Sequence, residues 1–397
     1  MNVEGWKAFR LVPNDVLFFR DSKPSVLGQD HYLRSIFPLF PSTLYGAVRT
    51  RRLFDQGVEL TGLKEATWQD RLGAALVDEL GPWGGFGSLE LRGPWLVRGN
   101  SEPLLPVPAD LGLRLAHGLR SNEERPEIAE VVRFRQGSAE NRRQSHPLAP
   151  LYPHTAAGSL WKAPGPGVEP RSAGGEWFLT PKGLSAWRRG GVPEASDLVH
   201  RTELWCDEAR TGVGLESERR ISEMGRLYTF GYIRLCSGIS IGFEVKGSGL
   251  QPGGFVRLGG EARTASLEMG PAFPSWTEGI SAGARWTLCF AAPALSEAGG
   301  YPPGFAESRL EGTLGDQHCR LTGAVLPRFV LSGGWDVARQ FPKPLRRAIP
   351  AGSVFLFESS TGEQVSPAEF DGRCYSDFPR EALTRQGFGL ALAGLSL

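Results

Sequence analysis

The sequence has little lysine and no excess of charge of either sign. Of its 44 basic side chains 37 are arginine, and 43 acidic side chains leave a formal net charge of +1. A strongly basic protein would indicate a nucleic-acid partner, and this balance does not. Arginine suits phosphate oxygens and stacks on bases, although a GC-rich genome explains the same excess. Any site for a polyanion must therefore come from local clustering.

Cysteine is also scarce, and its spacing excludes two structural devices. The five cysteines are odd in number and include no CxxC pair, which argues against a disulfide framework and a zinc site. The N-terminus MNVEGWKAFR has no apolar signal core, and no run of about 18 apolar residues indicates a transmembrane helix. We expect a cytoplasmic protein with no membrane attachment, no metal and no cofactor.

Turn formers are abundant, with 52 glycines and 30 prolines in 397 residues, which fits many short strands joined by tight loops. The length allows two domains. Residues 8–20 have a strand pattern with a bend at Pro13. Residues 89–97 and 103–111 are predicted to form a strand pair, and several further strand patterns follow residue 225. Helices are predicted at 43–54, 67–80 and near 378–387. This order predicts an α+β fold.

Residues 116–200 are weakly patterned and are interpreted as insertions over the core. Trp161, Trp177 and Trp187 indicate that part of this region packs. The stretch Arg133–Arg143 holds four arginines against Glu140. We interpret it as a mobile basic loop, in preference to a protruding hairpin that touches RNA or a neighbouring subunit.

Five segments, in order along the chain, resemble one known family. They are LVPNDVLFFRDSKP with SIFPLFPSTLYGAVRT, then RTGVGLE, EMGRLYTFGYIRL, FVRLGGEARTA and KPLRRAIPAGSVFLF. The terminal GFG is similar to the glycine-rich loop that closes RAMP domains. Together they resemble the type III-B CRISPR-associated subunit of the RAMP superfamily that grips the 5′ tag of the guide RNA, the third subunit of the Cmr complex.

The resemblance implies two ferredoxin-like (RRM-like) RAMP domains with long insertions, at 1–205, with the insertion at about 116–200, and at 206–397. It also implies a noncatalytic scaffold in antiviral defence. The expected partners are the 5′ tag of the crRNA, the large polymerase-like subunit and the first copy of the backbone RAMP subunit.

The stretch His31–Phe54 is the first candidate for RNA binding, because it contains four arginines and no acidic residue. On a helix capped by Ser42, the side chains of Tyr45, Arg49 and Arg52 would share one face, opposite Leu44, Ala47 and Val48. Such a face can stack a base and hold phosphates, and the helix start offers N–H groups to an anion. A solvated helix face is the alternative.

The stretch Val337–Phe357 is the second candidate, with Arg339, Lys343, Arg346 and Arg347 and no acidic residue. A proline-stiffened basic loop suits an RNA backbone, and a solvated loop is the alternative. Gly253–Thr264 and Arg210–Arg220 are weaker, since acidic residues interrupt both. The predicted RNA-binding residues are Arg20, His31, Arg34, Ser42, Thr43, Tyr45, Arg49, Arg52, Arg210, Arg257, Arg263, Lys343, Arg346 and Arg347.

Two further functions stay open. His31 and Tyr45 lie in a basic stretch, so a metal-independent endoribonuclease that processes CRISPR repeat RNA is the alternative enzyme. No HD, HExxH or GxSxG motif supports other hydrolases. Asp15 and Asp21 could bind a metal, although surface carboxylates are the simpler interpretation. A pure protein–protein adaptor is the third possibility.

Overall fold

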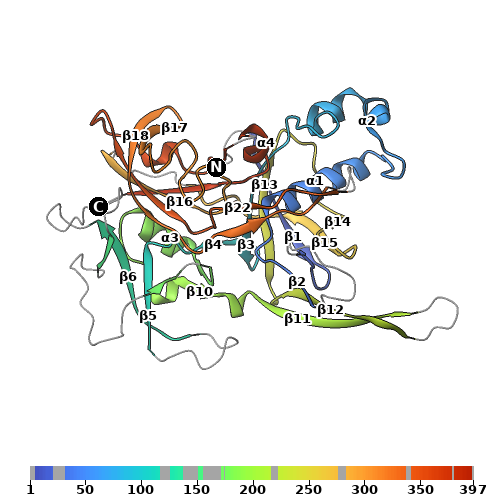
Figure 1. Cartoon of the computed structure of the whole chain (residues 1–397), viewed down its shortest axis with the longest axis horizontal. Helices are drawn as coiled ribbons and strands as arrows, with labels where there is room; N and C mark the ends of the chain where they lie inside the picture. Colours follow the sequence, from blue (N-terminus) through green and yellow to red (C-terminus); the bar gives the residue numbers. More distant parts are fainter. Residues whose placement is uncertain are drawn as a thin grey trace.

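The computed structural model describes residues 5–20, 32–116, 126–136, 151–154, 171–173, 175–215, 222–275, 283–336, 341–377 and 380–395. The protein is a strand-rich structure of mixed strands and helices, with few helices (Figure 1). Its α-helices are α1 (Pro41–Asp55), α2 (Glu65–Leu80), α3 (Pro181–Arg188) and α4 (Arg380–Arg385). They confirm the helices predicted at 43–54, 67–80 and near 378–387. No helix in the described ranges is long and apolar enough to cross a membrane.

The first sheet has eight strands in the order β10-β9-β4-β3-β13-β1-β15-β14, and all neighbours are antiparallel. The predicted pairing of 89–97 with 103–111 is confirmed where Leu96 faces Leu104. The main core contains α1 and α2 residues together with β1, β3 and β13 residues. The strands are β1 (Lys7–Pro13), β3 (Glu90–Arg98), β4 (Glu102–Pro106), β9 (Trp177–Leu179), β10 (Leu198–His200), β13 (Ile239–Lys246), β14 (Phe255–Arg257) and β15 (Thr264–Met269).

The second sheet has five strands in the order β17-β18-β23-β16-β24, again antiparallel throughout. They are β16 (Arg285–Phe290), β17 (Glu311–Leu314), β18 (Gln317–Val325), β23 (Val354–Ser359) and β24 (Ala391–Leu395). Trp95 of the first sheet and Cys289 of the second belong to one buried cluster, so the sheets share a core.

The strand pairing does not follow the division predicted at residues 205 and 206. Strands β13 and β15 come after that point, yet they flank β1 in the first sheet. The change from the first sheet to the second falls between β15 and β16. Sequence pattern shows where strands are but does not show which strands pair, so it misplaced this boundary.

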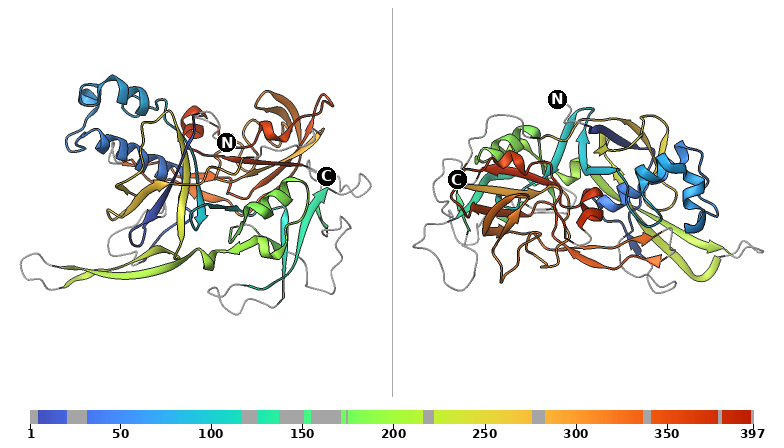
Figure 2. Two further views of the ribbon diagram at one scale, coloured as in Figure 1. Left: turned by 180° about the vertical axis from the view of Figure 1, so that it is seen from behind. Right: turned by 90° about the horizontal axis from the view of Figure 1, so that it is seen from above.

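A long two-stranded ribbon projects from the body (Figures 1 and 2). Its strands are β11 (Trp205–Leu215) and β12 (Ser222–Leu235), and the short β2 (Tyr32–Arg34) adds to β12 in parallel. Although β12 and β13 follow each other in the sequence, they belong to different sheets. Two of the segments that resemble the family, RTGVGLE and EMGRLYTFGYIRL, lie on this ribbon.

The predicted insertion is largely folded in its described part. Strands β5 (Leu111–Leu115), β6 (Ile128–Gln136), β7 (Leu151–His154) and β8 (Arg171–Ser172) form a four-stranded sheet. Trp177 and Trp187 are buried as predicted, whereas Trp161 lies outside the described residues.

The prediction of a mobile basic loop at Arg133–Arg143 is wrong for the residues of this stretch that the structure describes. Arg133 is 3% exposed and its guanidinium pairs with Asp110 at 2.7 Å, and Arg135 donates to the Gly190 carbonyl. A carboxylate supplied from outside the basic stretch makes this burial possible. Arg142 and Arg143 lie outside the described residues.

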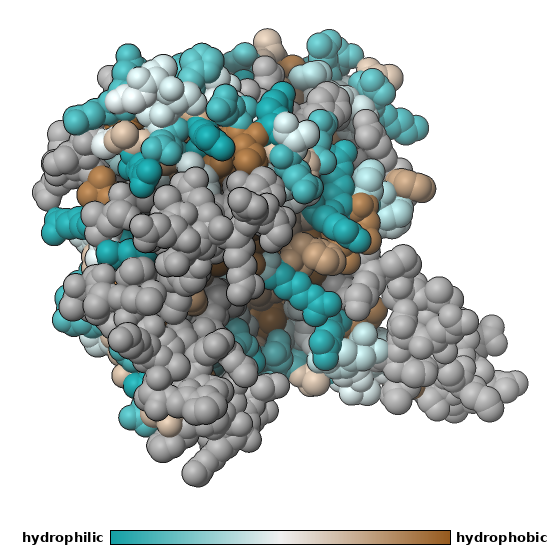
Figure 3. All heavy atoms as spheres, turned by 60° about the vertical axis from the view of Figure 1, so that its left-hand side comes forward, coloured by the Kyte–Doolittle hydropathy of each residue, from teal (hydrophilic) through white to brown (hydrophobic). Residues whose placement is uncertain are grey.

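Residues 326–336 and 341–348, here called the arm, leave the second sheet between β18 and β23. The arm is built from β19 (Val330–Ser332), β20 (Trp335–Asp336), β21 (Phe341–Pro342) and β22 (Arg346–Ala348), paired as β19 with β22 and β20 with β21. On the face shown in Figure 3, the coloured residues are mainly hydrophilic, and hydrophobic residues show in smaller areas between them.

Candidate nucleic-acid interface

The two basic segments predicted from the sequence meet in the fold. Phe40, directly before α1, and Val330 of the arm both pack against a small buried cluster that contains Ala348 and Phe388. Val330 and Ala348 are cross-strand partners in the arm. The start of α1, the base of the arm and the glycine-rich stretch 387–389 therefore lie together, although they are far apart in the sequence.

The face predicted on α1 is not an exposed face. Tyr45 is 3% exposed and its hydroxyl donates to the Leu89 carbonyl, while burial raises its pKa to about 12. Tyr45 is therefore not available to stack a base. The prediction failed because α1 is covered by the loop before β3 as well as by the sheet, so its buried arc is wider than a single stripe.

Arg52 is also enclosed rather than exposed. Its Nε and Nη2 donate to the two carboxylate oxygens of Glu79 on α2 at 2.7 and 2.9 Å, and this pairing raises the pKa of Arg52. A Cβ at Gly249 would lie 2.5 Å from Arg52 Nη2, so the chain closes tightly over the pair. Arg52 is thus a structural ion pair, and the prediction that it faces RNA is contradicted by its burial.

Arg49 is the remaining member of the predicted α1 face. It is half-buried, and its guanidinium lies 5.9 Å from the centroid of the Tyr45 ring and 6.0 Å from that of Phe86. The sequence places Tyr45 near Arg49, one helical turn earlier, and the fold adds Phe86.

The start of α1 differs from the prediction by two residues. The helix begins at Pro41 and its N-cap is Phe40, which offers no side-chain cap, so Ser42 is not the N-cap. The Thr43 N–H donates to the Phe40 carbonyl at 3.0 Å. Proline at the first helical position replaces the cap that serine was expected to supply, because its φ is already helical. Ser42 and Thr43 are half-buried.

Arg20 and Arg34 lie close together just ahead of α1. Arg20 and Ser35 form an isolated β-bridge, and both arginines are exposed. The Arg34 guanidinium lies over the exposed ring of Tyr32, 5.7 Å from its centroid. His31 lies outside the described residues.

The arm presents its cations to solvent. All seven residues from Phe341 to Arg347 are exposed, including Lys343, Arg346 and Arg347. The Arg347 guanidinium lies 4.9 Å from the centroid of the exposed Phe329 ring. No acidic residue occurs from 341 to 348, so this surface is locally cationic in an otherwise neutral protein.

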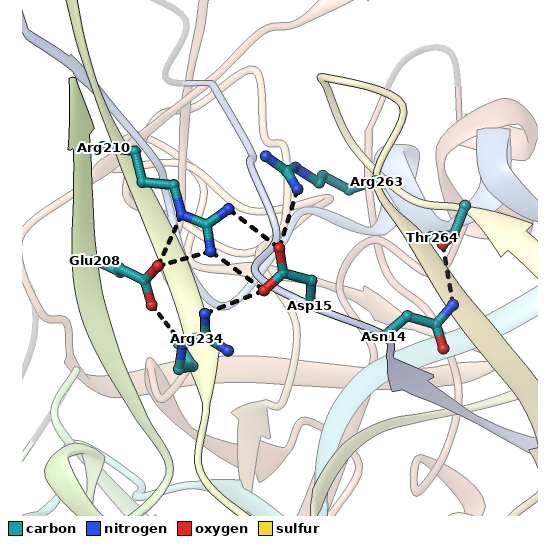
Figure 4. A network of polar contacts seen from close by, with 7 residues as sticks. All are labelled: Asn14, Asp15, Glu208, Arg210, Arg234, Arg263 and Thr264. Atoms are coloured by element: carbon teal, nitrogen blue, oxygen red, sulfur yellow. Dashed lines mark hydrogen bonds and ion pairs between the residues drawn. The ribbon is translucent and has the colours of Figure 1, made fainter. Parts of the chain in front are cut away.

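Arg210 and Arg263 belong instead to a network centred on Asp15 (Figure 4). Asp15, just after β1, accepts hydrogen bonds from Arg210 and Arg234 of the ribbon and from Arg263, at 3.1 to 3.2 Å. Glu208 accepts from Arg210 and Arg234 as well. This group of five residues is the Asp15 cluster.

The Asp15 cluster ties the ribbon to the first sheet. Hydrogen bonds from Arg210, the Val16 backbone N–H and Arg234 lower the pKa of Asp15 to about 2, and the one from Arg234 to Glu208 lowers the pKa of Glu208. The Tyr232 ring lies near Arg210 and Arg263, with centroid distances of 5.4 and 4.7 Å. Two carboxylates largely neutralise three guanidinium groups, so Arg210 and Arg263 are not the unopposed cations that the RNA prediction requires.

Arg257 lies on the edge strand β14, opposite Thr264, and is not a member of this cluster. It is exposed, and its guanidinium lies 5.6 Å from the centroid of the Phe54 ring at the end of α1. The predicted site residues therefore separate into an exposed group around the start of α1 and the arm, and a group engaged within the fold.

Sequence reasoning missed several residues of this surface. Arg234 joins the Asp15 cluster only through strand register, which the sequence does not reveal. Phe329, Trp335 and Phe341 are exposed on the arm, although their sequence pattern is that of buried strands. Within the described residues no group of three or more His, Cys, Asp or Glu side chains could hold a metal ion, and Asp21 is not among those residues.

Comparison with known proteins assigns the chain to a class and then to a family. A family model described as CRISPR-associated protein (Cas_Cmr3) matches residues 9–396. The protein is thus CRISPR-associated. More narrowly, it belongs to the Cas_Cmr3 family, subunits of type III-B Cmr complexes, and the resemblance found in the sequence is confirmed. No curated protein matches the chain.

Several solved structures are similar at low identity. A chain of the type III-B Cmr-beta complex bound to cognate target RNA and AMPPnP has 14% identity and a TM-score of 0.47, with 88% of this chain and 86% of that chain covered. A chain of the Cmr-beta complex bound to cognate target RNA has 13% identity and a TM-score of 0.47, with 88% of this chain and 86% of that chain covered. A chain of a type III-A Csm3–Csm4 subcomplex has 10% identity and a TM-score of 0.34, with 91% of this chain and 95% of that chain covered.

Proposed function

We propose that the protein is a noncatalytic RNA-binding scaffold of a type III-B CRISPR effector complex. It would hold the 5′ tag of the crRNA beside the large polymerase-like subunit and the backbone RAMP subunit, in the cytoplasm, as part of antiviral defence. Family membership supports the complex. The observation that carries RNA binding is the meeting of the start of α1 with the base of the cationic arm.

The RNA surface proposed is smaller than the one predicted from the sequence. Its cations are the exposed Arg20 and Arg34 and the arm residues Lys343, Arg346 and Arg347. Tyr32, whose exposed ring lies beneath Arg34, replaces the buried Tyr45 as the residue proposed to stack on a base. Guanidinium groups and an exposed ring are the contacts that single-stranded RNA uses.

Two ferredoxin-like domains are part of the same proposal. In that fold, the four strands counted along the chain lie side by side in the order fourth, first, third, second. In the first domain, β15-β1-β13-β3 has this order, and α1 and α2 follow the first strand. In the second, β24-β16-β23-β18 has the same order, with α4 before the last strand. This division assigns the first domain to residues up to 275 and the second to residues from 283.

Charge reversal at the base of the arm tests RNA binding. The double substitution Arg346→Glu and Arg347→Glu places negative charge on an exposed surface, so we expect affinity for a 5′-tag oligonucleotide to fall by about tenfold or more at 150 mM salt, with a shallower salt slope. The matched control is Lys182→Glu, an exposed lysine on α3. Equal affinity for wild type and double variant would refute this RNA site.

Incubation with repeat RNA tests the absence of catalysis. The endoribonuclease alternative relied on His31 and Tyr45, and Tyr45 is buried in the fold. We expect no specific cleavage by the purified protein. Cleavage that disappears in His31→Ala would replace the scaffold proposal with the enzyme.

A further inference from the structure

One surface of the arm combines an arginine with an exposed aromatic ring. The Arg347 guanidinium lies 4.9 Å from the centroid of the Phe329 ring, and Phe329 is 48% exposed. Arg347 is exposed as well. Guanidinium planes and aromatic rings that solvent can reach are the surfaces on which unpaired nucleobases stack. Phe329 and Arg347 are here called the arm platform.

Strand register places the arm platform on one face of the arm and Arg346 on the other. Arg347 pairs with Leu331 in the antiparallel pair of β19 and β22. Phe329, two residues before Leu331, shares the face of Arg347, in agreement with the contact between them. Arg346 and Ala348 point to the opposite face, where Ala348 is buried in the cluster next to the start of α1. The two arginines therefore offer RNA two different faces of the arm.

The charge around the arm platform suits a polyanion. The base of the arm, residues 326–332 and 346–348, contains Arg328, Arg346 and Arg347 and no acidic residue. All three arginines are exposed. Like charges that lie close together repel one another, and a run of phosphates relieves that repulsion. The base of the arm is therefore complementary to an RNA strand in both charge and ring chemistry.

A second platform of the same kind lies on the ribbon. The Arg34 guanidinium is 5.7 Å from the centroid of the Tyr32 ring, which belongs to β2, the strand that adds to β12. The ribbon lies in the connection between β3 and β13, and the arm lies in the connection between β18 and β23. In the two proposed ferredoxin-like domains, both are connections between the second and the third strand. Each domain thus presents one arginine–aromatic platform from the corresponding place.

We infer that the arm platform stacks on one unpaired nucleobase of the crRNA 5′ tag, as a second stacking site in addition to Tyr32. The inference rests on the proposed RNA binding and deepens it, because it assigns a role to the ring of Phe329 and selects single-stranded RNA. A nucleobase within a duplex already has a neighbour on both sides and cannot take up this platform. Arg346 contacts the RNA backbone from the opposite face of the arm.

The test measures the affinity of the full chain for a single-stranded 5′-tag oligonucleotide at several salt concentrations. Phe329→Leu keeps an apolar side chain but removes the ring, so affinity should fall by about tenfold with an unchanged salt slope. Phe329→Tyr keeps the ring and should stay within about twofold of wild type. Because the ring is exposed, the thermal unfolding midpoint of both variants should shift by less than about 2 °C.

An oligonucleotide that lacks one nucleobase separates stacking from other effects of the substitution. Abasic nucleotides are placed at each tag position in turn. At one position the missing nucleobase should weaken wild-type binding by about tenfold and leave Phe329→Leu binding unchanged, because the two changes remove the same contact. Equal losses for wild type and Phe329→Leu at every position would overturn the inference.

Phe54→Leu is the matched control. Its ring is also exposed and lies 5.6 Å from the Arg257 guanidinium, but at the far end of α1 from the arm. It should leave RNA affinity unchanged, and a loss equal to that of Phe329→Leu would overturn the inference. If wild type and Phe329→Leu bind equally well, the arm platform is not an RNA contact and the proposed function still stands. If wild type does not bind the oligonucleotide, the proposed function fails and the inference fails with it.

Discussion

The Asp15 cluster and the arm use arginine in opposite ways. In the cluster, Arg210, Arg234 and Arg263 converge on Asp15, and two of them also bond Glu208. On the arm, Arg346 and Arg347 are exposed where no acidic residue is near in sequence. The comparison teaches that arginine content does not locate an RNA site. What matters is how the fold surrounds each guanidinium group and how far the group stays exposed to solvent.

Arg52→Glu has the largest expected effect and tests the structural side of the comparison. It would place a second carboxylate against the buried Glu79, so the free energy of unfolding should fall by about 3–5 kcal/mol in urea denaturation. The control Arg346→Glu, at an exposed position, should change it by less than about 0.5 kcal/mol. If Arg52→Glu left stability unchanged and weakened RNA binding, α1 would belong to the RNA surface after all.

Asp15→Asn makes the Asp15 cluster more cationic. It removes one of two carboxylates that face three guanidinium groups, so the local charge becomes more positive. We expect RNA affinity to rise modestly and the slope of log affinity against log salt to steepen by up to about 1. A fall in affinity would show instead that the cluster orients the ribbon for RNA.

Arg210→Gln gives the smallest effect, on a single pKa. The Arg210 hydrogen bond is the largest cause that lowers the Asp15 pKa from 3.8 to about 2, so the substitution should raise it toward 3.8. Because the folded-state pKa is depressed, the stabilisation is complete above pH 3.8 and is lost as pH falls through about 2. An NMR titration of the Asp15 carboxyl measures it. An unchanged pKa would assign the shift to the Val16 backbone N–H or to Arg234.

The sequence predicted the elements well and their partners poorly. The helices near 43–54 and 67–80 were found because apolar periodicity and flanking turn residues are local signals. The boundary at 205 and 206 failed because β13 and β15 return to the first sheet through non-local pairing. The predicted exposure of Tyr45 and Arg52 was wrong for a related reason. The loop before β3 covers Tyr45 and α2 covers Arg52, on a side of α1 that the helix pattern predicts to be exposed.

By itself the sequence determined the mixed, strand-rich character of the fold, the main helices and the family, because local propensity and the order of motifs are set along the chain. Only the tertiary structure decided which carboxylate each of these arginines meets and how deeply the pair is buried. Desolvation and pairing depend on what approaches a side chain through space, and Glu79 reaches Arg52 from α2 just as Asp15 reaches Arg210 from the end of β1. The spacing of residues along the chain does not encode these ion pairs.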